Sequence, residues 1–444
     1  MSQVRHGRRR WLALGLAVCV TLAAAPSDLG QRISAIAAPY RFDATHWMAR
    51  QLLLPRQAES LPDNETPSHY VQRYLGINAE MDALERQRDA ALASNPQDSQ
   101  RADAVAELTR AMDDLRRVQR AMRPNVERIL AIQIRDALSE LGIRNPADPW
   151  ARLPFRFPPI AFRLESPPQL LVVSPRERIE SIQEIMLEQD LDLATALNLE
   201  EQVEELGLSA LVTDIGGFGG TYPTFVAESA SLRWTIETAT EEWLHQYLAF
   251  TPLGARYVLD LLGLCPDYEI ARINETVAGM VSQEVADVVL MQSYEKEGAP
   301  VLPTAGEGLA DEGFDYTGFM RETRVQVDRL LEAGRIEEAE AYMETRRREL
   351  VRHGYAIRKL NQAYFAFHGT YTYGPAAVDP IYEEIKLLRA QSPDLRAFLT
   401  TAAKLKSRAE LRALLELPPP QQALREESSW RSLLSDLARA PTRS

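Results

Sequence analysis

Residues 68–141 carry the strongest structural signal in the chain. The run is rich in Ala, Leu, Glu, Arg and Gln, and one polar break interrupts it at residues 94–99. Apolar residues such as Leu84, Leu108 and Leu115 recur at helical spacing, with charged residues between them. Because two helices joined by one short break pack against each other, the sequence predicts a helical hairpin over residues 68–145.

Prolines change the pattern over residues 146–175, where they separate short apolar runs typical of strands. A helix is expected over 178–190 and another near 199–206. Two further apolar runs, 210–215 and 224–227, flank the glycine-rich segment 216–220, which predicts a hairpin with a glycine tip. No Gly-Lys-Ser/Thr follows these glycines, so they are not interpreted as a phosphate-binding loop.

Helical patterns fill most of the chain after residue 229, and glycines mark the joints between them. The sequence therefore predicts an α+β fold dominated by helices, with a small mixed sheet. The expected parts are a targeting segment (1–25), an irregular linker (26–67), the hairpin (68–145), a main domain (146–416, with its sheet at about 155–228 and helices over 229–416) and a C-terminal tail (417–444). The helices expected after residue 229 span 231–250, 266–296, 317–333, 336–352, 354–368, 379–391 and 407–415.

The N-terminal segment has the composition of an export signal. A basic stretch at 6–10 precedes an apolar run at 11–25 that ends in three alanines, where a signal peptidase could cut. Pro26 is a poor residue to follow a cut, so an uncleaved N-terminal anchor is the alternative. We therefore expect an exported protein that is periplasmic, extracellular or attached to the outer face of the bacterial cytoplasmic membrane. No apolar run is long enough for a polytopic membrane protein.

Cysteine usage and charge narrow the classes of function. Cys19 lies in the apolar N-terminal run and Cys265 is alone in the rest of the chain, so no disulfide framework is expected. The formal net charge is -13, and an acidic surface repels phosphate groups. Nucleic acid is therefore not an expected partner.

The segment 238–248 holds the side chains most suited to chemistry. On a helix, Glu241 and His245 point the same way because they are four residues apart, while Glu242 is turned by about 100°. Trp234 and Leu248 extend this face, and a second apolar stripe lies on the opposite side, which predicts a helix buried over most of its circumference. A buried carboxylate needs a counter-ion, and a divalent metal is one candidate.

A second carboxylate, Glu275, lies about thirty residues later on the next long helix. Its neighbours on the same face, which include Ala278, Gly279 and Ser282, are small. Small side chains let a facing helix approach closely. Glu275 can therefore reach a metal ion held by Glu241 and His245.

These residues carry a resemblance to a known family. Glu-Glu-Trp-Leu-His at 241–245, followed by Asn-Glu-Thr-Val-Ala at 274–278, resembles the two active-site helices of gluzincin zinc metallopeptidases. There the first helix reads His-Glu-x-x-His and the second supplies a glutamate ligand. The Leu-Asn-Gln-Ala stretch at 360–363 is similar to one in a bacterial aminopeptidase group of that superfamily. The resemblance covers about residues 209–415 and implies a zincin-like core.

The resemblance implies a role for each matching residue. His245 and Glu275 would be metal ligands, and Glu242 would be the general base that takes a proton from water. Glu241 occupies the place of the family's first histidine. The implied metal is Zn²⁺, with iron or manganese as alternatives because two carboxylates accompany one imidazole, or no metal at all. Tyr371 and His368 are candidates to stabilise an oxyanion, although a histidine beside aromatic residues is more often part of a core.

Three hypotheses follow from these observations. The first is a metallopeptidase that acts on a peptide or protein substrate, with the 216–220 segment offering a strand edge to an extended peptide. The second is a pseudopeptidase in which the change to Glu241 abolished metal binding and left a peptide-binding or scaffold protein. The third is a helical adaptor that contacts a protein partner through the 68–141 hairpin.

Overall fold

The computed structural model describes residues 28–53, 60–62, 64–93, 99–147, 156–229, 231–261, 264–265, 267–295, 314–355, 357–368 and 380–417. The expected targeting segment, most of the expected C-terminal tail and Tyr371 lie outside these residues. The protein has a helix-dominated α+β fold, as the sequence predicts. Within the described part of the chain, no helix combines the length and the hydrophobicity of a membrane span.

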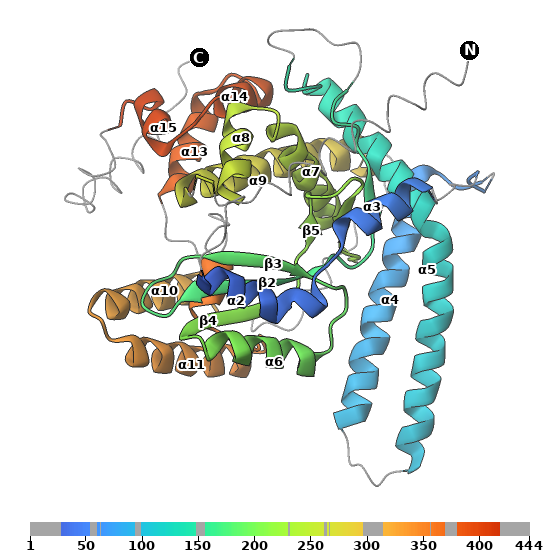
Figure 1. The fold of residues 1–444 in the computed structure, drawn as a ribbon. Coiled ribbons are helices and arrows are strands. Elements are labelled where there is room, and N and C mark those ends of the chain that lie inside the picture. Colours follow the sequence, from blue (N-terminus) through green and yellow to red (C-terminus); the bar gives the residue numbers. More distant parts are fainter. Residues whose placement is uncertain are drawn as a thin grey trace.

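The predicted helical hairpin is confirmed. It consists of α4 (Pro67–Ala93) and α5 (Ser99–Glu140), which lie side by side, with one end of the pair projecting from the rest of the molecule (Figure 1). The second half of α5 is buried through residues such as Val126, Leu130 and Ile134, which join the largest hydrophobic core. Their spacing of four residues gives α5 one continuous apolar stripe toward the main domain.

A group of helices forms one lobe of the main domain, and α9 (Tyr268–Leu290) runs through its centre. A short π-helix (Met291–Glu295) continues α9. Buried residues occupy nearly every turn of α9, because neighbouring helices cover it on several sides. The helices around it are α7 (Leu232–Leu248), α8 (Pro252–Leu261), α13 (Ile381–Gln391), α14 (Leu395–Ala402) and α15 (Arg408–Leu414).

The strands form two small sheets. In the first, β2 (Gln169–Pro175) lies between β3 (Gln183–Leu187) and β4 (Leu208–Thr213), and all pairs are antiparallel. In the second, β6 (Thr224–Val226) pairs in parallel with β1 (Phe162–Leu164) and antiparallel with β5 (Gly217–Phe218). The second sheet places β5 at an edge, beside α7.

Helices cover both faces of the β3–β2–β4 sheet. On one face, α2 (Asp28–Ala37) and α6 (Leu193–Glu204) enclose a small core. On the other face, α12 (Gln362–His368) packs through Ala363. Next to α12, α10 (Tyr316–Glu332) and α11 (Ile336–Arg352) form a helix pair with its own core, and Figure 1 shows this pair in the same lobe as the sheet.

Four expectations from the sequence are wrong. The helix expected at 178–190 is strand β3, because Ile185 and Leu187 enter the core under α2 and α6 while the strand pairs with β2. The runs at 210–215 and 224–227 do not form a hairpin: they supply β4 and β6 of different sheets, and the glycine segment itself supplies β5. The linker at 26–67 contains α2 and α3 (Ala44–Leu53). The helix expected at 354–368 begins only at Gln362.

Candidate metal centre

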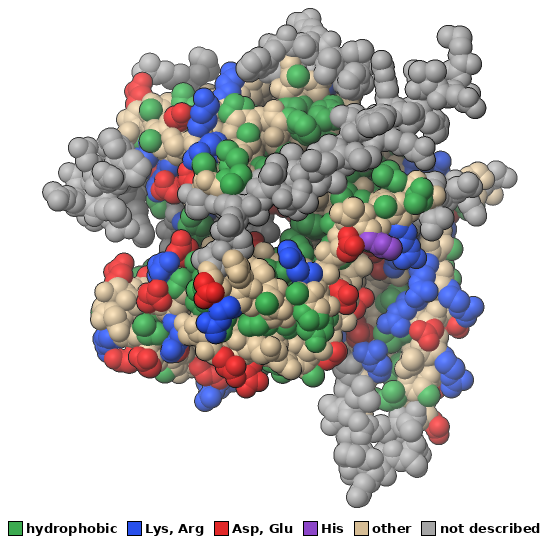
Figure 2. Space-filling model, viewed as in Figure 1, with side chains coloured by type: hydrophobic (Ala, Val, Ile, Leu, Met, Phe, Trp, Pro, Cys, Tyr) green, Lys and Arg blue, Asp and Glu red, His purple; other side chains and the backbone are tan. Residues whose placement is uncertain are grey.

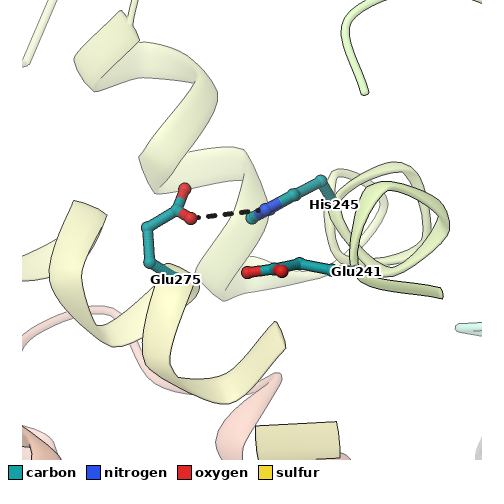
Figure 3. A group of neighbouring side chains, drawn as sticks. All are labelled: Glu241, His245 and Glu275. Atoms are coloured by element: carbon teal, nitrogen blue, oxygen red, sulfur yellow. Dashed lines mark ion pairs between the residues drawn. The ribbon is translucent and has the colours of Figure 1, made fainter. Parts of the chain in front are cut away.

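Helix α7 supplies the first two residues of the site. The Ser231 hydroxyl accepts a hydrogen bond from the Trp234 backbone N–H and caps the helix start. The helix is buried over most of its circumference, as predicted, and Glu241 and His245 project from one face of it. Because they are four residues apart, both side chains reach the same point (Figure 3).

Helix α9 brings the third residue to that point. Glu275 faces His245 across the α7–α9 interface, with 3.4 Å between Glu275 Oε2 and His245 Nε2. One ligand atom from each of Glu241, His245 and Glu275 can be chosen so that all three lie within 4.8 Å of one another. The small residues Ala278, Gly279 and Ser282 on α9 are buried, consistent with the expected close packing of the helices. The structure therefore brings together the three predicted ligands.

Two residues that the sequence analysis did not single out hold these ligands in place. Asn274 Oδ1 lies 2.9 Å from His245 Nδ1, and the Tyr257 hydroxyl donates a 2.8 Å hydrogen bond to Glu275 Oε1. Asn274 directly precedes Glu275, so the sequence could have predicted that its side chain lies near the site. Tyr257 comes from α8, and nothing in its sequence surroundings indicates the contact.

Glu242 lies under the glycine segment rather than in the ligand cluster. A Cβ atom built on Gly219 would be only 2.8 Å from Glu242 Oε2, and one built on Gly217 would also collide with the Glu242 carboxyl group. Glycine is therefore required for the β5 segment to pass this close to α7. The amide of Gln246, on the next turn of α7, donates hydrogen bonds to the carbonyl oxygens of Gly219 (3.1 Å) and Thr221 (2.6 Å) and fixes the segment there.

Burial and mutual charge control the ionisation of the site. Burial raises the pKa of Glu242 to about 8, with help from the negative charges of Glu241 and Glu275 and against the opposing effect of His245. Burial alone would lower the pKa of His245, but the surrounding carboxylates, Glu275 first, outweigh it and raise that pKa to about 10. Burial would raise the pKa of Glu275, yet His245 and the Tyr257 hydroxyl lower it. Glu275 and His245 therefore form an ion pair.

The donor set fits a divalent cation. Metal binding would require His245 to lose its proton, and two carboxylates with a neutral imidazole then carry a charge of about -2, which a divalent ion balances. A hydrogen bond from His245 Nδ1–H to Asn274 Oδ1 leaves Nε2, the nitrogen beside Glu275, as the ligand atom. The Tyr257 hydrogen bond orients Glu275 in the same way. Outer hydrogen bonds therefore position two of the three candidate ligands.

The structure does not join His368 to this cluster. His368 is the last residue of α12 and lies against two aromatic rings of the same helix, with centroid distances of 4.2 Å to Tyr364 and 5.0 Å to Phe367. Burial lowers its pKa to about 4, so the imidazole is neutral near pH 7. The environment of His368 is that of a packed aromatic cluster. Tyr371, the other oxyanion candidate, lies outside the described residues.

Asn361, in the stretch that resembles the aminopeptidase group, has a structural role. Its Oδ1 accepts a 2.9 Å hydrogen bond from the Tyr364 backbone N–H and so caps α12. Its Nδ2 donates a 2.9 Å hydrogen bond to the Ala210 carbonyl on β4, an edge strand. Asn361 thus caps the start of α12 and satisfies one carbonyl group at the edge of the sheet.

Comparisons of the chain with protein-family models, with curated proteins and with solved structures give no match. The fold and the site define a helix-dominated α+β protein with a candidate metal centre between two buried helices.

Proposed function

We propose that the protein is a metal-dependent peptidase. The observation that carries the proposal is the convergence of Glu241, His245 and Glu275 at one point, with Glu242 beside them under the β5 strand. Buried helices of a main domain hold the cluster, so its geometry does not depend on mobile surface side chains. Such pre-positioning is what a catalytic site needs.

Glu241, His245 and Glu275 would hold the metal ion. When bound, a divalent ion such as Zn²⁺ polarises a carbonyl group and lowers the pKa of water. Iron or manganese also suits two carboxylates and one imidazole. Asn274 keeps the His245 ring in the orientation that presents Nε2, and the Tyr257 hydroxyl keeps Glu275 Oε2 on the side of His245.

Glu242 is the residue placed to move protons. Its half-buried carboxyl group lies next to the ligand cluster and under the Gly217–Gly219 backbone. In peptide hydrolysis its ionised form, which a divalent ion at the cluster would favour, would accept a proton from the attacking water and deliver it to the departing amine. The two transfers leave the carboxylate in its starting state.

The β5 edge is the place for an extended substrate. The strand order β1–β6–β5 leaves one side of β5 without a strand partner among the described residues. A peptide that adds to this edge would lie across α7 beside Glu242, and its backbone would form the main contacts. The substrate class is accordingly a peptide or protein chain. Export, or anchoring at the outer face of the bacterial membrane, is part of this proposal.

The test is hydrolysis of a broad peptide library by the full chain, with and without a chelator. Activity should be lost in chelator, and should fall by at least about a hundredfold in Glu242→Gln, which keeps the shape of the side chain. Glu237→Gln is the matched control: Glu237 lies one turn before Glu241 on the same helix, pairs with Arg233 and is not one of the candidate ligands. Full hydrolysis by Glu242→Gln would refute the assigned base.

A peptide-binding pseudopeptidase is the second candidate, and two observations favour it. Glu241 stands where the gluzincin motif that this helix resembles has histidine, and His245 and Glu275 already satisfy each other as an ion pair. Metal analysis by mass spectrometry separates the candidates, on protein purified without metal-affinity resin. Near-stoichiometric metal that is lost in His245→Ala supports the enzyme. Metal bound only by Glu241→His supports the pseudopeptidase.

A further inference from the structure

A cavity lies apart from the residues of the metal centre. It has a volume of about 460 Å³ and is bordered by α3, by α5 and by the loops that follow β1 and β3. This volume is in the range of sites that hold small molecules. Figure 2 shows basic side chains gathered over α5 beside this region. The described residues that line the cavity include none of the candidate metal ligands.

One wall of the cavity is basic. Arg120 and Arg123 are one turn apart on α5, and Arg50 reaches the cavity from α3. Arg123 is already committed, because it forms two hydrogen bonds of 2.6 and 2.7 Å with the Glu228 carboxylate. Within the part of the chain that the structure describes, the side chains of Arg50 and Arg120 have no hydrogen bond or ion pair. Their guanidinium groups are therefore available to a ligand.

The loops that border the cavity carry carboxylates. Glu165 lies on the loop after β1, and Asp190 lies on the turn after β3. The Gln189 amide donates a hydrogen bond to the Ser166 carbonyl, so the two loops form one surface. Glu165 also accepts a 2.9 Å hydrogen bond from Trp47 Nε1, which ties this wall to α3. The Glu165 carboxylate is thus fixed in position at the cavity.

We propose that this cavity binds a zwitterionic small molecule of the amino-acid or short-peptide class. The ligand carboxylate would take bidentate hydrogen bonds from Arg50 and Arg120, a geometry that guanidinium groups favour. The ligand ammonium would lie at Glu165 and Asp190. Three arginines and three carboxylates line the cavity, so a ligand with no net charge but separated charges matches it better than a phosphate. This inference does not rest on the peptidase proposal.

Calorimetric titration of the full chain with glycylglycine, in buffer with chelator, tests the proposal. Saturable binding is expected. Affinity should fall by about tenfold or more for N-acetylglycylglycine, which lacks the ammonium, and for glycylglycinamide, which lacks the carboxylate. The same loss is expected in the Arg50→Gln/Arg120→Gln double variant. Arg117→Gln is the matched control, because Arg117 lies on α5 but pairs with Asp114 and does not line the cavity.

Several results would overturn the proposal. These are no saturable heat at millimolar glycylglycine, equal affinity for the two blocked dipeptides, or tighter binding of inorganic phosphate at the same residues. Binding that survives the double arginine variant but disappears in His245→Ala would place the dipeptide at the metal centre instead. A melting temperature within the error of the parent protein confirms that the double variant is folded, and Arg50→Gln alone provides a milder second test.

Discussion

The packing of Gly219 against α7 leads to a sharp prediction for Gly219→Ala. The new Cβ would lie 2.8 Å from Glu242 Oε2, 3.0 Å from the Glu242 carbonyl oxygen and 3.4 Å from His245 Cβ. The Glu242 side chain can rotate away, but its carbonyl oxygen belongs to the helix backbone and cannot. The glycine segment must therefore move.

The magnitude follows from what holds the segment. Forcing a methyl group into a packed contact costs about 1–3 kcal/mol. Moving the segment away strains the two Gln246 hydrogen bonds, each of which contributes about 1 kcal/mol. We expect Gly219→Ala to lower the free energy of unfolding by about 2 kcal/mol. Under the peptidase proposal it should also lower turnover at least tenfold, because the Glu242 carboxyl group is displaced.

Urea unfolding of the full chain measures this change, and Gly76→Ala is its control. Gly76 lies inside α4 and a Cβ there would meet nothing within 4 Å. The control should raise stability by about 0.5–1 kcal/mol, because alanine is the better helix former. If Gly219→Ala is as stable as the parent protein and as active, the glycine segment does not lie against α7 as described.

Three further predictions concern positioning and stability. Asn274→Ala should weaken metal binding by about ten- to a hundredfold, because the His245 ring loses its orienting partner; metal titration by calorimetry measures this. Asn361→Ala should lower the free energy of unfolding by about 1–2 kcal/mol, because it removes a helix cap and a bond to the β4 edge; urea unfolding measures this. Glu200→Gln should cost about 1–3 kcal/mol at pH 7 and progressively less in acid, as unfolding at a series of pH values would show.

The sign of the Glu200 effect comes from its surroundings. Burial would raise its pKa, but Arg358, Lys359 and the Val212 backbone N–H outweigh burial and lower it. A carboxyl group whose pKa is lower in the folded state stabilises the protein above its unfolded pKa, about 4.3, and the contribution is lost as pH falls through the folded value. A cost that stays constant from neutral to acid pH would contradict this. Unchanged metal affinity in Asn274→Ala would contradict the orienting role of Asn274. Unchanged stability in Asn361→Ala would contradict the capping role of Asn361.

Part of the candidate metal centre could be predicted from residue spacing in the sequence. The spacing of Glu241 and His245 places them on one helix face whatever surrounds that helix, so their shared direction could be predicted. The small residues around Glu275 favoured a close helix contact, and the structure has it. Tyr257, by contrast, reaches Glu275 from a different helix, α8, which the sequence analysis did not identify.

The sheets show where local pattern fails. Residues 183–187 can be read as helix or strand, and pairing with β2 decides the outcome, since Ile185 and Leu187 then enter one core. The glycine segment likewise forms strand β5 only because it pairs with β6 and packs against α7.

Helix periodicity is a local property. The amino-acid sequence by itself therefore determines the helical hairpin, the helix-rich main domain and which residues share a face of α7 or of α9. Strand pairing, the position of Glu242 under β5 and the joining of α3, α5 and two loops around the charged cavity depend on contacts between distant residues. The same apolar residues could be buried by several different strand pairings and helix packings. Only the packing of the whole folded protein selects one of them.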